Sequence, residues 1–228
     1  MIPKFLDEQL NQDTLLVILN AVYFKGVWEE PFDEKKTYIR SFQVSNTKRK
    51  LVEFMSAFKS FSFAKGKTHD SSYNMIRYKD SGIGFVTFLP SKGDCPLETV
   101  DLDLVSKMDQ AENDIEVNFA MPKFEISSKY SLKKMLEELG MESMFTRYQD
   151  FENIMEGAGT VTDIIHAAKV KVDEKGAEAA GATAVEYMSD EYLSHILDRE
   201  FGFFIVDFKT RMILFSGVYR GPQEDSFE

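Results

Sequence analysis

The chain has 228 residues, of which 43% are hydrophobic and 13% aromatic, so it can build a packed core and is not expected to be disordered. Its 27 Lys and Arg against 38 Asp and Glu give a net charge of −11, which disfavours binding to nucleic acid because phosphate backbones repel an acidic chain. Cys95 is the only cysteine, which excludes an internal disulfide framework and a thiolate metal site, and the longest apolar runs are far too short to span a bilayer.

The first half of the chain is predicted to consist mostly of strands. Residues 15–24 form an apolar run broken only by Asn20, which predicts a strand buried on both faces. Further strands are expected, in chain order, at residues 37–44, 54–64, 73–78 and 83–89. Residues 97–110 are a helix candidate.

The second half adds one clear helix and several long strands. Residues 115–126 predict a long strand in which Pro122 marks an edge or a bend. Residues 131–139 predict an amphipathic helix, with Ser131 as its N-cap and Gly140 at its end. Strands are expected at residues 161–172, 201–206 and 212–218, the last two as a hairpin. The pattern as a whole predicts an α+β fold dominated by antiparallel strands.

No pattern of an enzyme active site is present. The sequence lacks an H-E-x-x-H motif, a G-x-S-x-G motif and a glycine-rich phosphate loop. Its three histidines, His69, His166 and His195, stand far apart without metal-ligand spacing. Asp163 and His166 are close in sequence, but strand alternation puts residues three apart on opposite faces. We therefore expect no enzyme, no metal and no cofactor.

The most informative stretch is residues 174–185, which read Glu-Lys-Gly-Ala-Glu-Ala-Ala-Gly-Ala-Thr-Ala-Val. A flexible linker, a short alanine-rich helix and a mobile strand are all compatible with this composition. As a strand, it presents one face of small or β-branched residues, namely Ala177, Ala179, Gly181, Thr183 and Val185. A segment that slips between two strands needs small side chains and no proline, and this segment meets both conditions.

This stretch resembles the hinge of the reactive-centre loop of the serpins, which are suicide inhibitors of proteases that act through a conformational change. Other segments resemble the family in the same order along nearly the whole chain: residues 20–28, 121–124, 131–140, 151–154, 165–168, 201–205 and 213–217. The resemblance implies one partial serpin domain over residues 1–228, with mainly antiparallel sheets A, B and C and a few helices. The N-terminal helical part of that domain has no counterpart in the chain.

The resemblance implies that residues 174–198, approximately, form a reactive-centre loop. A protease attacks the loop, and the freed hinge then inserts into sheet A and carries the protease with it. Gly176 is the expected pivot, since glycine tolerates the change in backbone conformation. Ala177 departs from the Thr or Ser usual in the family. The residues that take hinge roles by position are Glu174, Gly176, Ala177, Ala179, Ala180, Gly181 and Thr183.

Four further residues acquire expected roles from the resemblance. Asn20 and His166 match a polar pair that holds the opening strands of sheet A closed, although two unrelated buried polar residues remain an alternative. Lys123 matches the partner of Glu174 in an ion pair at the top of sheet A. Trp28 is expected to cap the same region, with ordinary core packing as the alternative.

The cleaved bond determines which protease would be trapped. Counting from the hinge by the family's spacing places the bond after Asp190 and before Glu191, which suits Asp-specific proteases of the caspase or granzyme type. Counting back from the closing hairpin gives Ser189, and Met188 is the other alternative. Either of these would suit chymotrypsin-like or elastase-like serine proteases. Residues 187–195 hold no Arg or Lys, which disfavours a trypsin-like target.

The expected partner is therefore a target protease, with no nucleic acid and no membrane. The rival hypotheses are a non-inhibitory serpin-fold carrier, chaperone or storage protein, and an inactive truncated fragment that self-associates. The family favours an extracellular location, while one cysteine and no glycosylation sequon suit a cytoplasmic member as well. The first ten residues show no signal-peptide pattern, but a signal peptide cannot be assessed because the N-terminus looks truncated.

Overall fold

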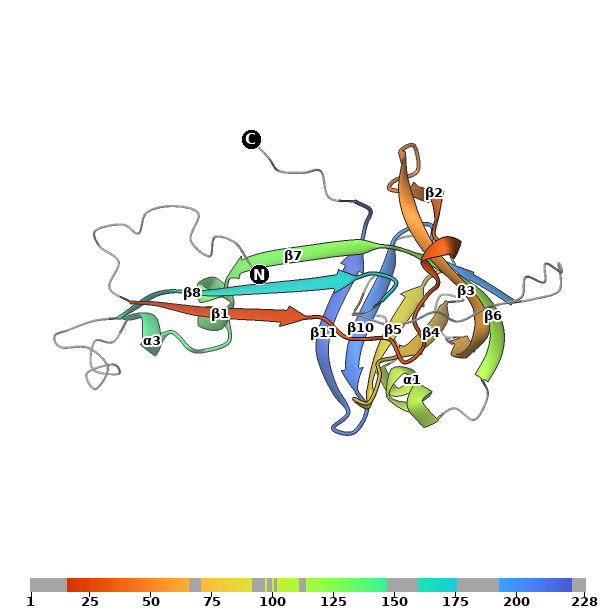
Figure 1. Ribbon diagram of the computed structural model, residues 1–228. Helices are drawn as coiled ribbons and strands as arrows, with labels where there is room; N and C mark the ends of the chain where they lie inside the picture. The colour runs from red at the N-terminus through yellow and green to blue at the C-terminus, as the bar shows by residue number, and fades with distance from the viewer. Residues whose placement is uncertain are drawn as a thin grey trace. The chain divides into compact units, whose positions relative to one another are not determined.

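The structure is a computed structural model that describes residues 16–65, 71–91, 97, 100, 102–110, 114–146, 160–175 and 193–222. The chain divides into two compact units. Unit 1 comprises residues 1–24 and 125–171, and unit 2 comprises residues 25–124 and 172–228. The strands fall into a three-stranded sheet and an eight-stranded sheet (Figure 1).

The three-stranded sheet forms most of unit 1. Its strands lie in the order β1 (Leu16–Phe24), β8 (Val161–Val172) and β7 (Phe124–Ser131), and β1 runs parallel to β8 (Figure 1). Two short helices follow β7 in the chain, α2 (Lys133–Glu138) and α3 (Ser143–Thr146). The predicted strands at residues 15–24 and 161–172 are thus confirmed, β1 to within one residue.

The predicted burial of β1 on both faces is wrong. Ile18, Leu19 and Tyr23 are 37%, 45% and 45% exposed, although all three belong to the apolar run. Within the described residues β1 pairs only with β8 and lies at the edge of its sheet. An apolar run indicates burial only where other elements cover both faces of the strand, and the described elements leave part of β1 open to solvent.

The predicted N-cap of α2 is also wrong. Ser131 is the last residue of β7, and its Oγ donates to Asp163 Oδ1 at 2.7 Å. The residue that precedes the helix is Leu132, which makes no side-chain capping bond. The hydroxyl of Ser131 was expected to cap the helix, but it donates instead to a carboxylate on the neighbouring strand β8. The predicted end is confirmed, since Gly140 follows the helix with φ +90°, a conformation that glycine adopts readily.

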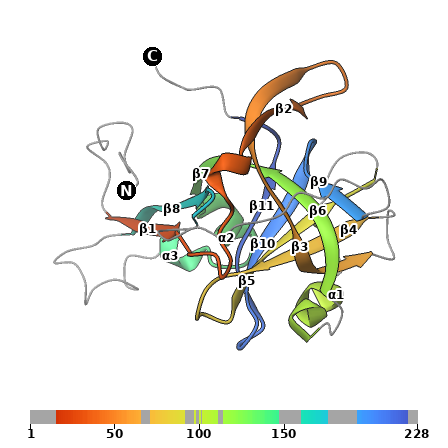
Figure 2. The same ribbon diagram turned by 45° about the vertical axis from the view of Figure 1, so that its right-hand side comes forward.

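The eight-stranded sheet forms the body of unit 2 (Figure 2). Seven strands follow one another in the order β11-β10-β5-β4-β3-β6-β9, and β2 pairs with β3 off this path. All pairs are antiparallel except β6 with β9. The bounds are β2 Tyr38–Gln43, β3 Arg49–Lys65, β4 Ser72–Arg77, β5 Ile83–Leu89, β6 Asp114–Pro122, β9 Leu193–Ile196, β10 Phe201–Asp207 and β11 Met212–Tyr219.

The single strand predicted at residues 115–126 is split in two. β6 ends at Pro122, which lies opposite Phe54, and β7 begins at Phe124 in the other sheet. The bend expected at Pro122 is therefore a change of sheet, and it leaves Lys123 between the two strands. This position gives Lys123 its role in the site described below.

The helices of unit 2 are short. The candidate at residues 97–110 is reduced to α1 (Leu102–Lys107) and a 3-10 turn η3 (Met108–Gln110), and a second turn, η1 (Glu34–Lys36), precedes β2. None of the helices in the described part of the chain has the length and apolar character needed to cross a membrane.

A cluster of aromatic rings holds the centre of unit 2 together. Successive ring centroids lie 4.9–6.5 Å apart, within the range in which aromatic pairs attract. All members are at most 7% exposed: Phe85, Phe124, Phe201, Phe203 and Tyr219. They come from β5, from the start of β7 and from β10 and β11, so the cluster joins strands distant in the sequence.

Gly217 provides a test of this packing. A Cβ at Gly217 would lie 2.6 Å from Cζ of Phe203, so Gly217→Ala must displace a ring of the cluster. Overpacking of this kind costs about 1–3 kcal/mol, which we expect as the loss in the free energy of unfolding measured with urea. The matched control is Ser216→Ala on the exposed face of the same strand, with an expected change within about 0.5 kcal/mol. Equal effects for the two variants would contradict the packing described.

Candidate functional site

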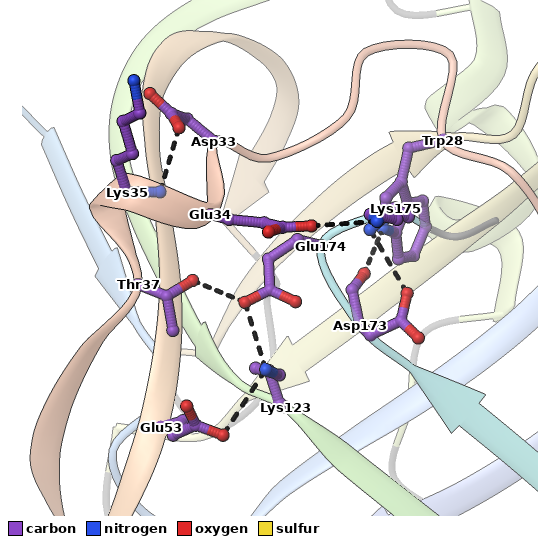
Figure 3. Close-up of polar contacts among 10 residues, drawn as sticks. All are labelled: Trp28, Asp33, Glu34, Lys35, Thr37, Glu53, Lys123, Asp173, Glu174 and Lys175. Carbon is purple, nitrogen blue, oxygen red and sulfur yellow. Dashed lines mark hydrogen bonds and ion pairs between the residues drawn. The ribbon is translucent and has the colours of Figure 1, made fainter. Parts of the chain in front are cut away.

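The segment Asp173–Lys175 leads from β8 toward the predicted hinge, and a cluster of side chains holds it in place (Figure 3). We call this set the anchor cluster. It consists of the segment itself and of five residues from elsewhere in unit 2: Trp28, Glu34, Thr37, Glu53 and Lys123.

Glu174 is the centre of the anchor cluster. The residue is 6% exposed, and its Oε1 accepts a hydrogen bond from Thr37 Oγ1 at 2.6 Å and lies 3.2 Å from Lys123 Nζ (Figure 3). Its main-chain carbonyl accepts from the N–H of Phe32 at 3.0 Å. A nearly buried carboxylate is tolerated only when it is paired in this way. Both the side chain and the backbone of Glu174 are therefore fixed.

Glu174 and Lys123 each stabilise the charged form of the other. Burial alone raises the pKa of the Glu174 carboxyl, but the hydrogen bonds from Thr37 and Lys123 and the charge of Lys123 outweigh burial, and the pKa is lowered. Burial lowers the pKa of Lys123, but its bonds to Glu174 and Glu53 leave it raised. Lys123 Nζ is 3.4 Å from Glu53 Oε2, so one ammonium bridges two carboxylates. Both partners are charged at neutral pH.

Trp28 fixes the residue before Glu174. Its Nε1 donates to the carbonyl oxygen of Asp173 at 2.8 Å, and its ring is 1% exposed and stacked on Tyr78 with centroids 4.5 Å apart. Because the indole N–H donates to this carbonyl, the ring position and the path of the segment are coupled.

Lys175 is held more loosely than Glu174. Its Nζ lies 3.2 Å from Glu34 Oε1 in η1, and both side chains are more than half exposed (Figure 3). Its backbone N–H donates to Asp173 Oδ1 at 3.2 Å. Exposed ion pairs contribute about 0–1 kcal/mol, so the restraint on the segment weakens from Glu174 to Lys175.

The structure brings together three of the residues named from the sequence, Trp28, Lys123 and Glu174. Sequence reasoning missed the other partners, above all Thr37 and Glu53. Thr37 lies 137 residues from Glu174, and no local pattern marks a threonine before a strand as a partner of a distant carboxylate. Lys123 and Glu174 were named from the resemblance, which gave no sign of Thr37 or Glu53.

Asn20 and His166 lie in unit 1 and are directly opposite each other in the parallel pairing of β1 and β8. Residues so paired point to the same face of a sheet. Asn20 is exposed and His166 half-buried, and the described part of the chain shows no hydrogen bond between their side chains. Their role in holding the sheet closed stays a prediction.

The other predicted site residues lie outside the described residues. These are Gly176, Ala177, Ala179, Ala180, Gly181 and Thr183 of the hinge, and Met188, Ser189, Asp190 and Glu191 around the cleaved bond. The C-terminal part of the predicted loop is described from Leu193 onward, where it forms β9. Among the described residues no group of three or more His, Cys, Asp or Glu is placed to hold a metal ion.

Comparison with known proteins identifies the family. The model of the family described as Serpin (serine protease inhibitor) matches residues 1–222. The chain is 31% identical over 231 residues to human serpin B4 and 33% identical over 223 residues to serine protease inhibitor 42Dd of Drosophila melanogaster, covering 96% and 93% of its own length. The chain therefore belongs to the serpin family.

The solved structures agree with this assignment. Human thyroxine-binding globulin superposes with a TM-score of 0.80 at 26% identity over 95% of the chain, and human kallistatin with a TM-score of 0.81 at 24% identity. The fold is that of a serpin. The chain spans 58% and 57% of the lengths of the two curated relatives and 59% of each of these structures.

Replacing Glu174 tests the anchor cluster. We expect Glu174→Gln to lower the free energy of unfolding at pH 7 by about 1–3 kcal/mol, because a charged hydrogen-bonding group is lost from a nearly buried position. The folded pKa of Glu174 is below its ordinary value of 4.5, so its contribution is present above pH 4.5 and is lost as pH falls through the folded pKa.

The measurement is urea unfolding of both proteins from pH 7 down to pH 3. The difference in the free energy of unfolding between wild type and Glu174→Gln should decrease below pH 4.5. Glu138→Gln is the control, since Glu138 forms an exposed pair with Lys134 at 3.9 Å and should cost at most about 0.5 kcal/mol. A difference in the free energy of unfolding that stays constant from pH 7 to pH 3 would contradict the assignment of Glu174 as ionised in the folded protein.

Proposed function

We propose that the complete protein inhibits a protease by offering its loop for cleavage and inserting the cleaved loop into the sheet of unit 1, and that it is not an enzyme. The observation that carries this proposal is the anchor cluster, which fixes Glu174 directly before a stretch of small residues. Residues 176–184 contain only Gly, Ala and Thr apart from Glu178. Insertion requires a fixed starting residue followed by a segment of small side chains, and Glu174 and residues 176–184 fit these two requirements.

Cleavage of the loop is catalysed by the target protease and not by the inhibitor. The protease nucleophile bonds to the carbonyl carbon before the cleaved peptide bond, the C–N bond breaks, and the leaving amine receives a proton from the general acid of the protease. An acyl-enzyme remains on the loop. If the loop inserts before water hydrolyses the acyl bond, the protease is carried along and distorted. Asp190, Ser189 and Met188 are the candidates for the acylating residue.

The pairing in unit 1 supports the proposal that insertion is energetically favourable. β1 and β8 run parallel over nine paired residues, and the loop follows β8 directly in the chain. A segment that turns back after β8 and enters between the two strands is antiparallel to both. One parallel ladder is then replaced by two antiparallel ladders, which are more stable per residue. Asn20 and His166 lie within the pairing that must open.

A non-inhibitory carrier is the second candidate. It is favoured by the likeness to thyroxine-binding globulin, a serpin-fold protein whose structure is a complex with thyroxine. The small side chains of residues 176–184 favour inhibition instead, since a carrier does not need them. The target would be a serine protease or an Asp-specific protease of the caspase or granzyme type, and an extracellular location stays a prediction beside a cytoplasmic one.

The test is to mix the complete protein with a panel of proteases that includes an Asp-specific enzyme. We expect a covalent complex that survives SDS, and mass spectrometry of the released C-terminal peptide should identify the residue before the cleaved bond. Cleavage without a complex for every protease would leave a substrate or a carrier and would contradict inhibition.

A hinge substitution separates insertion from cleavage. Thr183 lies on the small-residue face of the stretch, so Thr183→Arg would bury an unpaired charge on insertion at a cost of several kcal/mol. We expect the share of protease trapped to fall about tenfold or more while loop cleavage continues. Glu178→Gln, on the opposite face, should trap like wild type. Trapping by Thr183→Arg at the wild-type level would argue against insertion.

A further inference from the structure

His195 is a buried histidine that the anchor cluster does not use. It lies in β9, which begins at Leu193, and is 1% exposed. β9 runs parallel to β6, where His195 is paired with Phe119, and the two rings are stacked with centroids 5.8 Å apart. The imidazole therefore has an apolar surface on one side and no access to bulk water.

Both ring nitrogens of His195 contact hydroxyl groups. Nδ1 is 3.0 Å from Ser72 Oγ in β4, and Nε2 is 3.2 Å from Thr87 Oγ1 in β5. In the sheet order β3 and β6 separate β4 from β9, so these contacts are not made between neighbouring strands. They join β9 to two strands with which it forms no ladder.

The donors and acceptors can be assigned along this chain of bonds. Thr87 Oγ1 donates to the carbonyl oxygen of Asn74 at 3.3 Å, so its lone pairs remain to accept from His195 Nε2–H. Nδ1 then carries no proton and accepts from the hydroxyl of Ser72. A second proton, on Nδ1, would face a hydroxyl that must turn its own proton away. The arrangement fits the neutral imidazole.

The electrostatic surroundings act in the same direction. Burial, followed by the positive charge of Arg199, lowers the pKa of His195 from 6.5 to about 3. Ser72 of β4, Thr87 of β5 and Phe119 of β6 contact the imidazole, and none of these three groups titrates near neutral pH.

We infer that His195 is a positioning residue for the reactive loop: it fastens β9, the strand that follows the loop, to β4 and β5, and releases that strand when the imidazole gains a proton. The inference rests on the proposed function in treating the segment before β9 as the reactive loop. β9 holds the C-terminal end of that segment as the anchor cluster holds its N-terminal end. The loop thus has one end fixed by charges and one end fixed by a neutral histidine.

The direction of the pH effect follows from linkage. When β9 is detached, His195 is solvated and binds a proton below pH 6.5, whereas in the closed sheet it stays neutral down to about pH 3. The closed state is therefore most stable relative to the detached state above pH 6.5, and its advantage decreases as pH falls below that value. Between pH 7 and pH 5 the opening equilibrium of β9 should increase about 25-fold, given pKa values of 6.5 and about 3.

Hydrogen exchange of the full chain, followed by mass spectrometry between pH 7 and pH 5, measures this opening without any protease. After correction for the intrinsic exchange rate, peptides that cover residues 193–199 should lose about 25-fold in protection, while peptides from β10 (Phe201–Asp207) should change little. Failure of the complete protein to trap any protease would refute the proposed function and leave this result unaffected.

His195→Gln is the decisive variant, because glutamine can donate and accept hydrogen bonds but does not titrate in this range. Its β9 peptides should lose the extra pH dependence even if their protection is lower at every pH. Ser72→Ala keeps the imidazole and should keep the pH dependence. A wild-type pH dependence in β9 no larger than in β10, or its persistence in His195→Gln, would overturn the inference.

Discussion

The ion pair between Lys123 and Glu174 is the interaction on which the path of the chain before the loop depends. Lys123 is placed by the break after Pro122, where the chain leaves one sheet for the other, and Glu174 lies just past the end of β8. Glu174 is only 6% exposed, and a carboxylate in such a position requires a cation and hydrogen-bond donors. The pair thus fixes where the predicted hinge begins.

The two ends of the predicted loop are held by different physical means. At the start, charged groups and a buried indole fix the segment, and the restraint weakens toward Lys175. At the end, a short strand of four residues depends on a neutral imidazole buried among hydroxyls. A short strand alone is a weak attachment, so side-chain contacts across the sheet matter more for β9 than for the longer strands.

The sequence predicted most strands, and the resemblance named three residues of the anchor cluster, Trp28, Lys123 and Glu174. It could not predict partners set by tertiary contact. Ser131 looked like a helix cap, but its hydroxyl bonds to Asp163, 32 residues away. His195 looked like an isolated histidine, and its partners Ser72 and Thr87 lie 123 and 108 residues earlier. The burial of β1 was misjudged because an apolar pattern says nothing of which layers cover a strand.

Insertion of the cleaved loop is the central claim, and a single measurement addresses it without knowledge of the target. The complete protein is nicked within residues 186–191, so that residues 176–185 stay joined to β8, and its thermal unfolding is compared with that of the intact protein. Ten newly paired residues, at about 1 kcal/mol each, should raise the midpoint by roughly 20 °C. An unchanged or lowered midpoint after nicking would contradict insertion and leave a loop that is merely cut.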